Sequence, residues 1–252
     1  MGMLENIQTG RESKPPRIMI YGSEGVGKST FGASAPGAIF VQTEDGLGEI
    51  NCKKFPLAHS LAEVLAELTA LRDEQHDFQT VVVDSADWLE RLIFDEVCRE
   101  YGVRNIEKAD GGYGRGYTHA LTHWRKVINL LQELRDKRGM MVILVAHAKV
   151  ERFEDPENAA YDRYTPRLHK HAASLIAEWV DAVLFANKKF RVTKENDRAI
   201  AAPIGSDGGE RIIRTVGSPA CIAKNRYGLP AEIPLSWQAF IDAYSKIEEQ
   251  NK

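Results

Sequence analysis

One short segment near the start of the chain limits its possible folds more than any other. Gly22-Ser-Glu-Gly-Val-Gly-Lys28-Ser29 fits the pattern G-x-x-x-x-G-K-[ST] at every fixed position. Glycines let the backbone turn its N–H groups toward an anion, and the N-terminus of a following helix favours negative charge. The segment directly follows a short apolar run, residues 17–22, and precedes residues that favour a helix. The sequence therefore predicts a strand, a phosphate-binding loop and a helix, in that order.

The residue types in this loop fit the phosphates of a nucleotide and the cation that accompanies them. Lys28 would reach the β and γ phosphates, and the hydroxyl of Ser29 would bind Mg²⁺. The sequence thus predicts a P-loop NTPase that uses ATP and Mg²⁺. The predicted nucleotide contacts are Gly22, Ser23, Glu24, Gly25, Val26, Gly27, Lys28, Ser29 and Thr30.

Composition indicates a globular protein and excludes several other classes. Hydrophobic residues make up 43% of the 252 residues and charged residues 27%, which is enough apolar material for a full core. No apolar stretch approaches the length of about 20 residues that spans a bilayer, and residues 1–17 contain no apolar signal-peptide core. The 3 cysteines form no CxxC pair. We expect a reduced, cytoplasmic protein with no membrane partner, and its net charge of −3 does not exclude nucleic acid.

Apolar runs that predict strands alternate along the chain with segments that predict helices. Strands alternating with helices favour a mostly parallel, twisted sheet with helices on both faces. From residue 188 onward, shorter strands and turns predict an antiparallel extension. We expect a flexible lead-in over residues 1–16 and a single domain over residues 17–252. The clearest predicted strands are residues 17–22, 38–43, 80–84 and 140–146, and the clearest predicted helices are residues 61–71, 88–97, 117–138 and 237–247.

Three polar residues end or follow predicted strands and could reach the nucleotide. Asp84 ends the run TVVVD and would hold the Mg²⁺ shell; the alternative is an ordinary solvated carboxylate. Glu44 follows the second strand and would orient the attacking water in catalysis, unless it only forms a turn before Gly46. His147 closes the fourth strand and would sense the γ phosphate, unless nearby backbone groups satisfy its imidazole.

The order of these elements resembles the RecA-like core, and the resemblance extends toward the C-terminus. Ala223-Lys224-Asn225-Arg226-Tyr227-Gly228-Leu229-Pro230 looks like the K-x-R-x-G element of DnaB-type replicative helicases. The resemblance implies that Lys224 and Arg226 join Lys28 and Glu44 in catalysis, acting on the nucleotide of a neighbouring subunit. With E-D-G and V-A-H included, residues 17–235 are most similar to phage-encoded RecA-like ATP-binding proteins of the Sak single-strand-annealing type.

RecA-type cores bind single-stranded DNA through two loops, and the resemblance assigns both here. The first, residues 109–117, offers Tyr113 and Tyr117 for stacking and Arg115 for a phosphate; the alternative is a glycine-rich linker. The second is a predicted loop over residues 149–167, whose acidic residues offset its cations, so a plain solvated loop is the alternative. Its candidate DNA contacts are Lys149, Arg152 and Arg163.

Two further patterns are less specific. Residues 188–226 contain nine Lys or Arg residues against four Asp or Glu residues, which favours a second DNA-facing surface or a subunit interface. His119 and His123 have the spacing of metal ligands on a helix. They lack a third ligand and the Glu of an H-E-x-x-H motif, so we expect no zinc site there.

The sequence thus predicts a RecA-like ATPase that binds single-stranded DNA and assists phage homologous recombination, by annealing or strand pairing. ATP and Mg²⁺ would organise a homo-oligomer, a ring or a filament, and a single-strand-binding protein could be a partner. A helicase-like P-loop motor or loader is the first alternative, and a small-molecule or nucleoside kinase is the second. A GTPase fits less well, because Asn187-Lys188-Lys189-Phe190 lacks the Asp of an NKxD motif.

Overall fold

The computed structural model describes residues 3–7, 9, 10, 12, 14–195, 198–204 and 209–250. Its strands are β1 (Arg17–Gly22), β2 (Ala38–Gln42), β3 (Lys53–Lys54), β4 (Thr80–Asp84), β5 (Met141–Phe153), β6 (Tyr161–Pro166), β7 (Ala182–Lys188), β8 (Phe190–Glu195), β9 (Arg198–Pro203), β10 (Arg211–Arg214), β11 (Lys224–Asn225) and β12 (Glu232–Pro234). Its helices are α1 (Lys28–Ala33), α2 (Leu61–Asp73), α3 (Ala86–Glu100), α4 (Arg115–Arg138), α5 (Lys170–Trp179) and α6 (Trp237–Gln250), with two short 3-10 helices, η1 (Met3–Asn6) and η2 (Ile106–Gly111).

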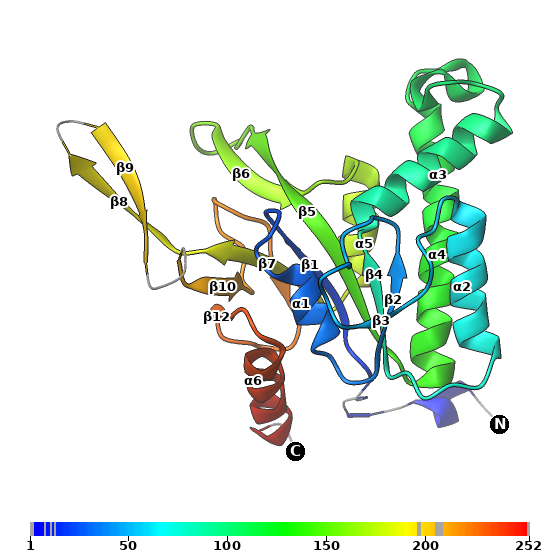
Figure 1. Ribbon diagram of the computed structural model, residues 1–252, viewed down its shortest axis with the longest axis horizontal. Helices are drawn as coiled ribbons and strands as arrows, with labels where there is room; N and C mark the ends of the chain where they lie inside the picture. Colours follow the sequence, from blue (N-terminus) through cyan, green and yellow to red (C-terminus); the bar gives the residue numbers. More distant parts are fainter. Residues whose placement is uncertain are drawn as a thin grey trace.

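Within the described residues, the main element is a 10-stranded sheet in the order β12-β10-β7-β1-β5-β4-β2-β3, with β11 beside β7 and β6 beside β5. The central strands β7, β1, β5, β4 and β2 all run parallel. Strands β10 and β12 extend one edge of the sheet in antiparallel order, and β8 pairs with β9 in a separate hairpin that points away from the body (Figure 1). The predicted α/β fold with an antiparallel C-terminal extension is confirmed.

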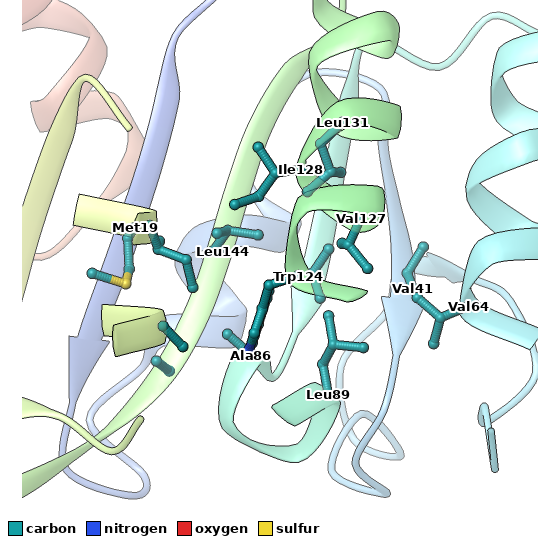
Figure 2. Packing of buried hydrophobic residues seen from close by; sticks show 14 of the residues in the cluster. Met19, Val41, Val64, Ala86, Leu89, Trp124, Val127, Ile128, Leu131 and Leu144 are labelled. Atoms are coloured by element: carbon teal, nitrogen blue, oxygen red, sulfur yellow. The ribbon is translucent and has the colours of Figure 1, made fainter. Parts of the chain in front are cut away.

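Apolar side chains on the central strands alternate between two faces, because successive residues of a strand point to opposite sides. Leu144 of β5 packs in one cluster with Trp124 of α4, and Figure 2 shows helix α4 laid against that strand. The preceding residue, Ile143, packs in the other cluster with Phe31 of α1 and Phe240 of α6. Helices α2, α3, α4 and α5 therefore cover one face of the sheet, and α1 and α6 cover the other.

The register of the parallel strands brings their carboxyl ends to one edge of the sheet. Gly22 at the end of β1 lies beside His147 of β5. Asp84 at the end of β4 lies beside Gln42 of β2, two residues before Glu44. Ligands of open α/β sheets bind at this carboxyl edge. The fold thus gathers the residues that the sequence predicted to contact the nucleotide.

Two projections rise from the same edge of the sheet (Figure 1). The first, which we call the knob, comprises the end of α3, η2 and the start of α4. The second is a β-hairpin of β5 and β6, in which Val150 pairs with Tyr164. The prediction of a loop over residues 149–167 is therefore wrong for most of that segment. Its ladder of hydrogen bonds depends on a partner strand, which a mixed run of charged and aromatic residues does not reveal.

Parts of two predicted regions lie outside the described residues. In the predicted lead-in these are residues 1, 2, 8, 11 and 13, whereas Met3–Asn6 form η1. In the predicted basic region they are residues 196, 197 and 205–208, together with the side chains of residues 191–201 and 203. In the part of the chain that is described, no helix combines the length and hydrophobicity needed to cross a membrane.

Candidate nucleotide-binding site

The P-loop joins β1 to α1, and its path requires glycine at two positions. Gly22 ends β1 so close to β7 that a Cβ atom there would overlap with the Ala186 carbonyl oxygen. Gly27, directly before α1, has a φ of 113°, a conformation that side chains other than that of glycine disfavour. These glycines let the loop turn sharply at the carboxyl edge and enter α1 at Lys28.

A cavity of about 340 Å³ opens beside this loop. It joins residues from the ends of three strands, because Glu44 follows β2, Asp84 ends β4 and His147 lies on β5. Two apolar side chains, Leu47 and Ile50, complete its wall. The predicted site residues that line it are Glu24, Gly25, Gly27, Lys28, Ser29, Thr30, Glu44, Asp84 and His147.

Lys28, which the sequence predicts to contact the β and γ phosphates, is buried inside the P-loop. Its ammonium group donates hydrogen bonds to the carbonyl oxygens of Gly22 (3.1 Å) and Ser23 (2.8 Å). Burial lowers the pKa of Lys28, and the nearby carboxylate of Asp84 opposes that shift by favouring the charged ammonium. Val26, another residue of the loop, packs instead in the core under α1 and α6.

Asp84 offers an oxygen that fits a small cation. Its side chain is buried, and its Oδ2 has no hydrogen-bond partner among the described residues. Burial raises the pKa of Asp84, whereas the hydroxyl of Ser29 favours its ionised form. A buried, unpartnered carboxylate oxygen beside a hydroxyl suits Mg²⁺, which prefers oxygen ligands and takes several from water and phosphates. The described residues contain no cluster of three or more His, Cys, Asp or Glu side chains that could hold a metal.

The carboxylate of Glu44 lies at the cavity wall between Ser85 and His147. Its Oε2 accepts a hydrogen bond from the hydroxyl of Ser85 (2.9 Å) and lies 3.8 Å from His147 Nδ1. The backbone of Glu44 also forms a turn, because its carbonyl oxygen accepts from the N–H of Gly46 (3.0 Å). The backbone of Glu44 therefore forms the turn, while its side-chain carboxylate lies at the cavity wall.

Asp87, on the first turn of α3, is a site residue that the sequence analysis missed. Its carboxylate accepts hydrogen bonds from the backbone N–H (3.0 Å) and Nδ1 (3.0 Å) of His147. Burial raises the pKa of Asp87, but hydrogen bonds from His147 and Arg167 outweigh that effect and hold it well below its usual range. The available signal was its position three residues after Asp84, where a helix leaves the carboxyl edge.

Arg211 of β10 is a second residue that the sequence analysis did not assign to the nucleotide. Its side chain lines the cavity, and its Nη1 would lie 3.4 Å from a Cβ atom placed on Gly27. Strand β10 belongs to the antiparallel extension and pairs with β7. Its contribution therefore depends on the sheet order, which no local pattern around Arg211 reveals.

Lys224 and Arg226 lie at the other end of the sheet. Strand β11 pairs with the amino end of β7, at Ala182 and Val183, whereas Gly22 of the P-loop lies beside Ala186. Lys224 Nζ donates to three carbonyl oxygens at the end of α5, those of Ala177 (2.5 Å), Val180 (2.7 Å) and Glu178 (3.2 Å). Arg226 lies on the same side of its segment and contacts the Glu178 carbonyl oxygen (3.4 Å).

The aromatic residues of the knob differ in exposure. Tyr113 is 100% exposed and stands within a run of left-handed residues that ends at Gly114. Tyr117 instead packs inward, where its ring stacks on His169 with centroids 4.1 Å apart and planes 4° apart. Arg115 donates a hydrogen bond to the carbonyl oxygen of Asp110 (3.2 Å).

The cations of the hairpin pair largely within the hairpin and its base. Lys149 Nζ donates to the Leu168 carbonyl oxygen (3.0 Å), and Arg152 pairs with Glu154 (3.2 Å). The Arg163 guanidinium lies over the ring of Phe153, 3.9 Å from its centroid. In the knob, His119 contacts Asp110 (3.1 Å), and on α4 His123 contacts Glu100 (3.1 Å), so these imidazoles have carboxylate partners.

Comparisons with known proteins agree with this architecture. The SPbeta prophage-derived uncharacterized protein YorG of Bacillus subtilis (strain 168) is 26% identical over 183 residues, which cover 71% of this chain and 52% of that protein. The chain thus spans about half the length of this relative. The crystal structure of the RadB recombinase matches 90% of each chain with a TM-score of 0.50 and 13% sequence identity, a likeness of fold.

A family model described as an AAA domain, AAA_24, matches residues 14–227. The match begins before β1 and ends after β11, so it contains the P-loop, Glu44, Asp84 and His147. The chain belongs to this AAA domain family, and its fold is that of a RecA-like P-loop NTPase.

Proposed function

We propose that this protein binds and hydrolyses ATP with Mg²⁺ and binds single-stranded DNA in phage homologous recombination, by annealing or strand pairing. The observation that carries the proposal is the cavity in which Lys28 and Ser29 of the P-loop meet Asp84 and Glu44. A point charge, a hydroxyl and two carboxylates are the groups that phosphoryl transfer to water requires.

Each group in the cavity has a separate task in this proposal. Mg²⁺ bound with ATP would neutralise the charge that develops on the phosphates. Ser29 and Asp84 would hold that cation, and the unpartnered Oδ2 of Asp84 supports this role. Glu44 orients the water that attacks the γ phosphate, since its carboxylate is held at the cavity wall by Ser85.

The two projections at the carboxyl edge support the DNA part of the proposal. Bases of single strands stack on exposed aromatic rings, and Tyr113 offers such a ring on the knob. The hairpin adds Lys149, Arg152 and Arg163, although each of these cations now has a partner within the chain. The prophage-derived relative and the recombinase-like fold support the phage recombination context.

We also propose a homo-oligomer, a ring or a filament, in which Arg226 and Lys224 act on the nucleotide of a neighbouring subunit. Lys224 lies on β11, and Arg226 follows that strand directly. Strand β11 pairs with the amino end of β7, whereas the chain's own P-loop lies at the carboxyl edge. A contact with the P-loop of another copy is therefore more favourable geometrically than one within the chain.

ATP hydrolysis measured with and without poly-dT, together with particle mass by light scattering, tests the proposal. We expect DNA to stimulate hydrolysis and ATP to promote assembly. Stimulated hydrolysis without annealing of complementary oligonucleotides would favour the motor or loader. Phosphate transfer to a nucleoside, with no affinity for poly-dT, would favour the kinase and contradict the proposal.

A further inference from the structure

Arg167 is held firmly on one side of its guanidinium group. Its Nε (3.1 Å) and Nη2 (2.9 Å) donate to the Oδ2 of Asp87, whose side chain is 2% exposed. Its backbone N–H also donates to the carbonyl oxygen of His147 (2.8 Å). A charge-assisted pair in which two N–H groups donate to one carboxylate oxygen fixes the position of the guanidinium. Asp87 therefore acts as an anchor for Arg167 and for His147 together.

The other side of the guanidinium has a weak partner. Arg167 Nη1 lies 3.3 Å from Oε1 of Glu24, a residue of the P-loop whose side chain is 75% exposed. Exposed ion pairs contribute little stability, because water and salt screen them. This arm of Arg167 can exchange Glu24 for a stronger anion without loss of its anchor on Asp87.

The weak partner lies at the place where nucleotide phosphates are expected. Glu24 and His147 both line the P-loop cavity. Arg167 bonds directly to Glu24, and its anchor Asp87 bonds to the imidazole of His147. Phosphate oxygens carry more charge than a carboxylate and accept bidentate hydrogen bonds from arginine. We propose that Arg167 is a ligand of the γ phosphate in its own subunit, where ATP replaces Glu24 at Nη1, and that Asp87 is the positioning residue.

This inference rests on the proposed binding of ATP and adds a means of telling ATP from ADP. ADP lacks the γ phosphate, so it leaves the pair between Arg167 and Glu24 in place. Arg167 also follows directly on Pro166, the last residue of β6. When the γ phosphate replaces Glu24 as the partner of Arg167, the contact that holds the base of the β5–β6 hairpin therefore changes with the bound nucleotide.

The first test measures dissociation constants of fluorescent ATP and ADP analogues for Arg167→Gln and for the wild type. We expect affinity for ATP to fall about 10- to 100-fold, the value of a hydrogen bond to a charged group, with ADP nearly unaffected. Arg99→Gln is the matched control, because Arg99 pairs with Glu96 on the exposed surface of α3 (2.6 Å). An unchanged ratio of ATP to ADP affinity in Arg167→Gln would overturn the inference.

Glu24→Gln supplies a second test with the opposite sign, at an exposed position where folding is not at risk. Removal of the competing carboxylate should increase the preference for ATP over ADP. That gain should vanish when Arg167→Gln is added. A gain that persists in the double variant would mean that Glu24 acts on the nucleotide directly, and the inference would be wrong.

Asp87→Asn tests the anchor separately. It keeps one carbonyl oxygen as an acceptor but removes the charge that holds Arg167, so the ATP preference should fall as in Arg167→Gln. A preference equal to that of the wild type would remove Asp87 from the inference. A wild type that binds neither nucleotide would refute the proposed function, whereas tight but indiscriminate binding by the wild type would refute only the role of Arg167.

Discussion

The hydroxyl of Ser85 donates a hydrogen bond of 2.9 Å to Glu44 Oε2, which joins the segment after β2 to the segment after β4. The same oxygen lies 3.8 Å from Nδ1 of His147. Three neighbouring strands thus converge on one carboxylate at the cavity wall. A carboxylate held in this way is suited to orient a water molecule rather than only to close a turn.

Glu44→Gln should separate ATP binding from hydrolysis. The amide keeps the size of the side chain and can still accept from Ser85, but it no longer accepts a proton from the attacking water. We expect nearly normal ATP affinity and a turnover lower by about 10²-fold or more. Phosphate release and nucleotide affinity measured on one preparation check this expectation. Wild-type turnover in the variant would mean that Glu44 only forms a turn and has no part in catalysis.

Tyr113→Ala should weaken binding to poly-dT without affecting ATP. The side chain of Tyr113 is fully exposed among the described residues, so its removal should change the fold little, whereas a stacked base contributes about 1–3 kcal/mol to binding. Tyr113→Phe is the matched control, because it keeps the stacking face and should bind like the wild type. Fluorescence anisotropy with labelled poly-dT gives both affinities. Equal affinity of the Ala and Phe variants for poly-dT would mean that Tyr113 does not stack on DNA and that its loop is only a linker.

Arg226→Ala should bind ATP but hydrolyse it poorly, and activity should return in mixtures with Lys28→Ala. Arg226 is the freer of the two predicted cations, since its side chain is 53% exposed while Lys224 is held by helix carbonyl oxygens. Mixed oligomers contain some interfaces with an intact P-loop facing an intact arginine. Because an arginine finger contributes about 10³–10⁵-fold in rate, even a minority of such interfaces should be measurable.

Two results would contradict this trans assignment. Normal hydrolysis by an oligomeric Arg226→Ala variant would show that the arginine has no part in catalysis. Activity in the mixture no greater than the sum of the two separate variants would show that no site is shared between subunits. Light scattering on each sample ensures that the variants still assemble.

The contribution of Glu90 to the stability of the protein should fall as the pH rises from about 4.5 to about 7. Burial raises the pKa of Glu90 from 4.5 to about 7, although the backbone N–H of His169 (2.8 Å) favours its carboxylate. In this range the folded chain binds more protons than the unfolded chain, so the stabilisation present below pH 4.5 is lost by pH 7. For Glu90 this shift corresponds to a loss of about 3 kcal/mol.

Glu90→Gln isolates that contribution, because a neutral amide does not titrate and can still accept from His169. Urea unfolding of both proteins at pH 5 and pH 8 should show a smaller pH dependence in the variant. A slope identical to that of the wild type would mean that Glu90 remains ionised when buried. Glu67, whose pKa burial also raises to about 7, should add to the pH dependence of both proteins equally.

Features that depend on neighbours along the chain could be predicted from the amino-acid sequence. The P-loop was identifiable because its glycines, Lys28 and Ser29 must stand at set spacings. The predicted helix over residues 61–71 is found as α2 (Leu61–Asp73), and its N-terminus is capped by residues close by in the chain, Ser60 and Glu63. In the structure Ser60 Oγ accepts from the Glu63 N–H (3.3 Å), and the Glu63 carboxylate accepts from the His59 N–H (2.8 Å).

The distant residues that complete the site could be identified from the fold alone. Asp87 and His147 meet because β4 and β5 are adjacent and α3 leaves β4 at the carboxyl edge. Arg167 reaches Glu24 across 143 positions of the chain, through the return of β6 to the base of β5. The same packing turns Tyr117 inward onto His169, while Tyr113 stays exposed. Such contacts depend on strand order and helix packing, which arise from burial over the whole chain and leave no local spacing to recognise.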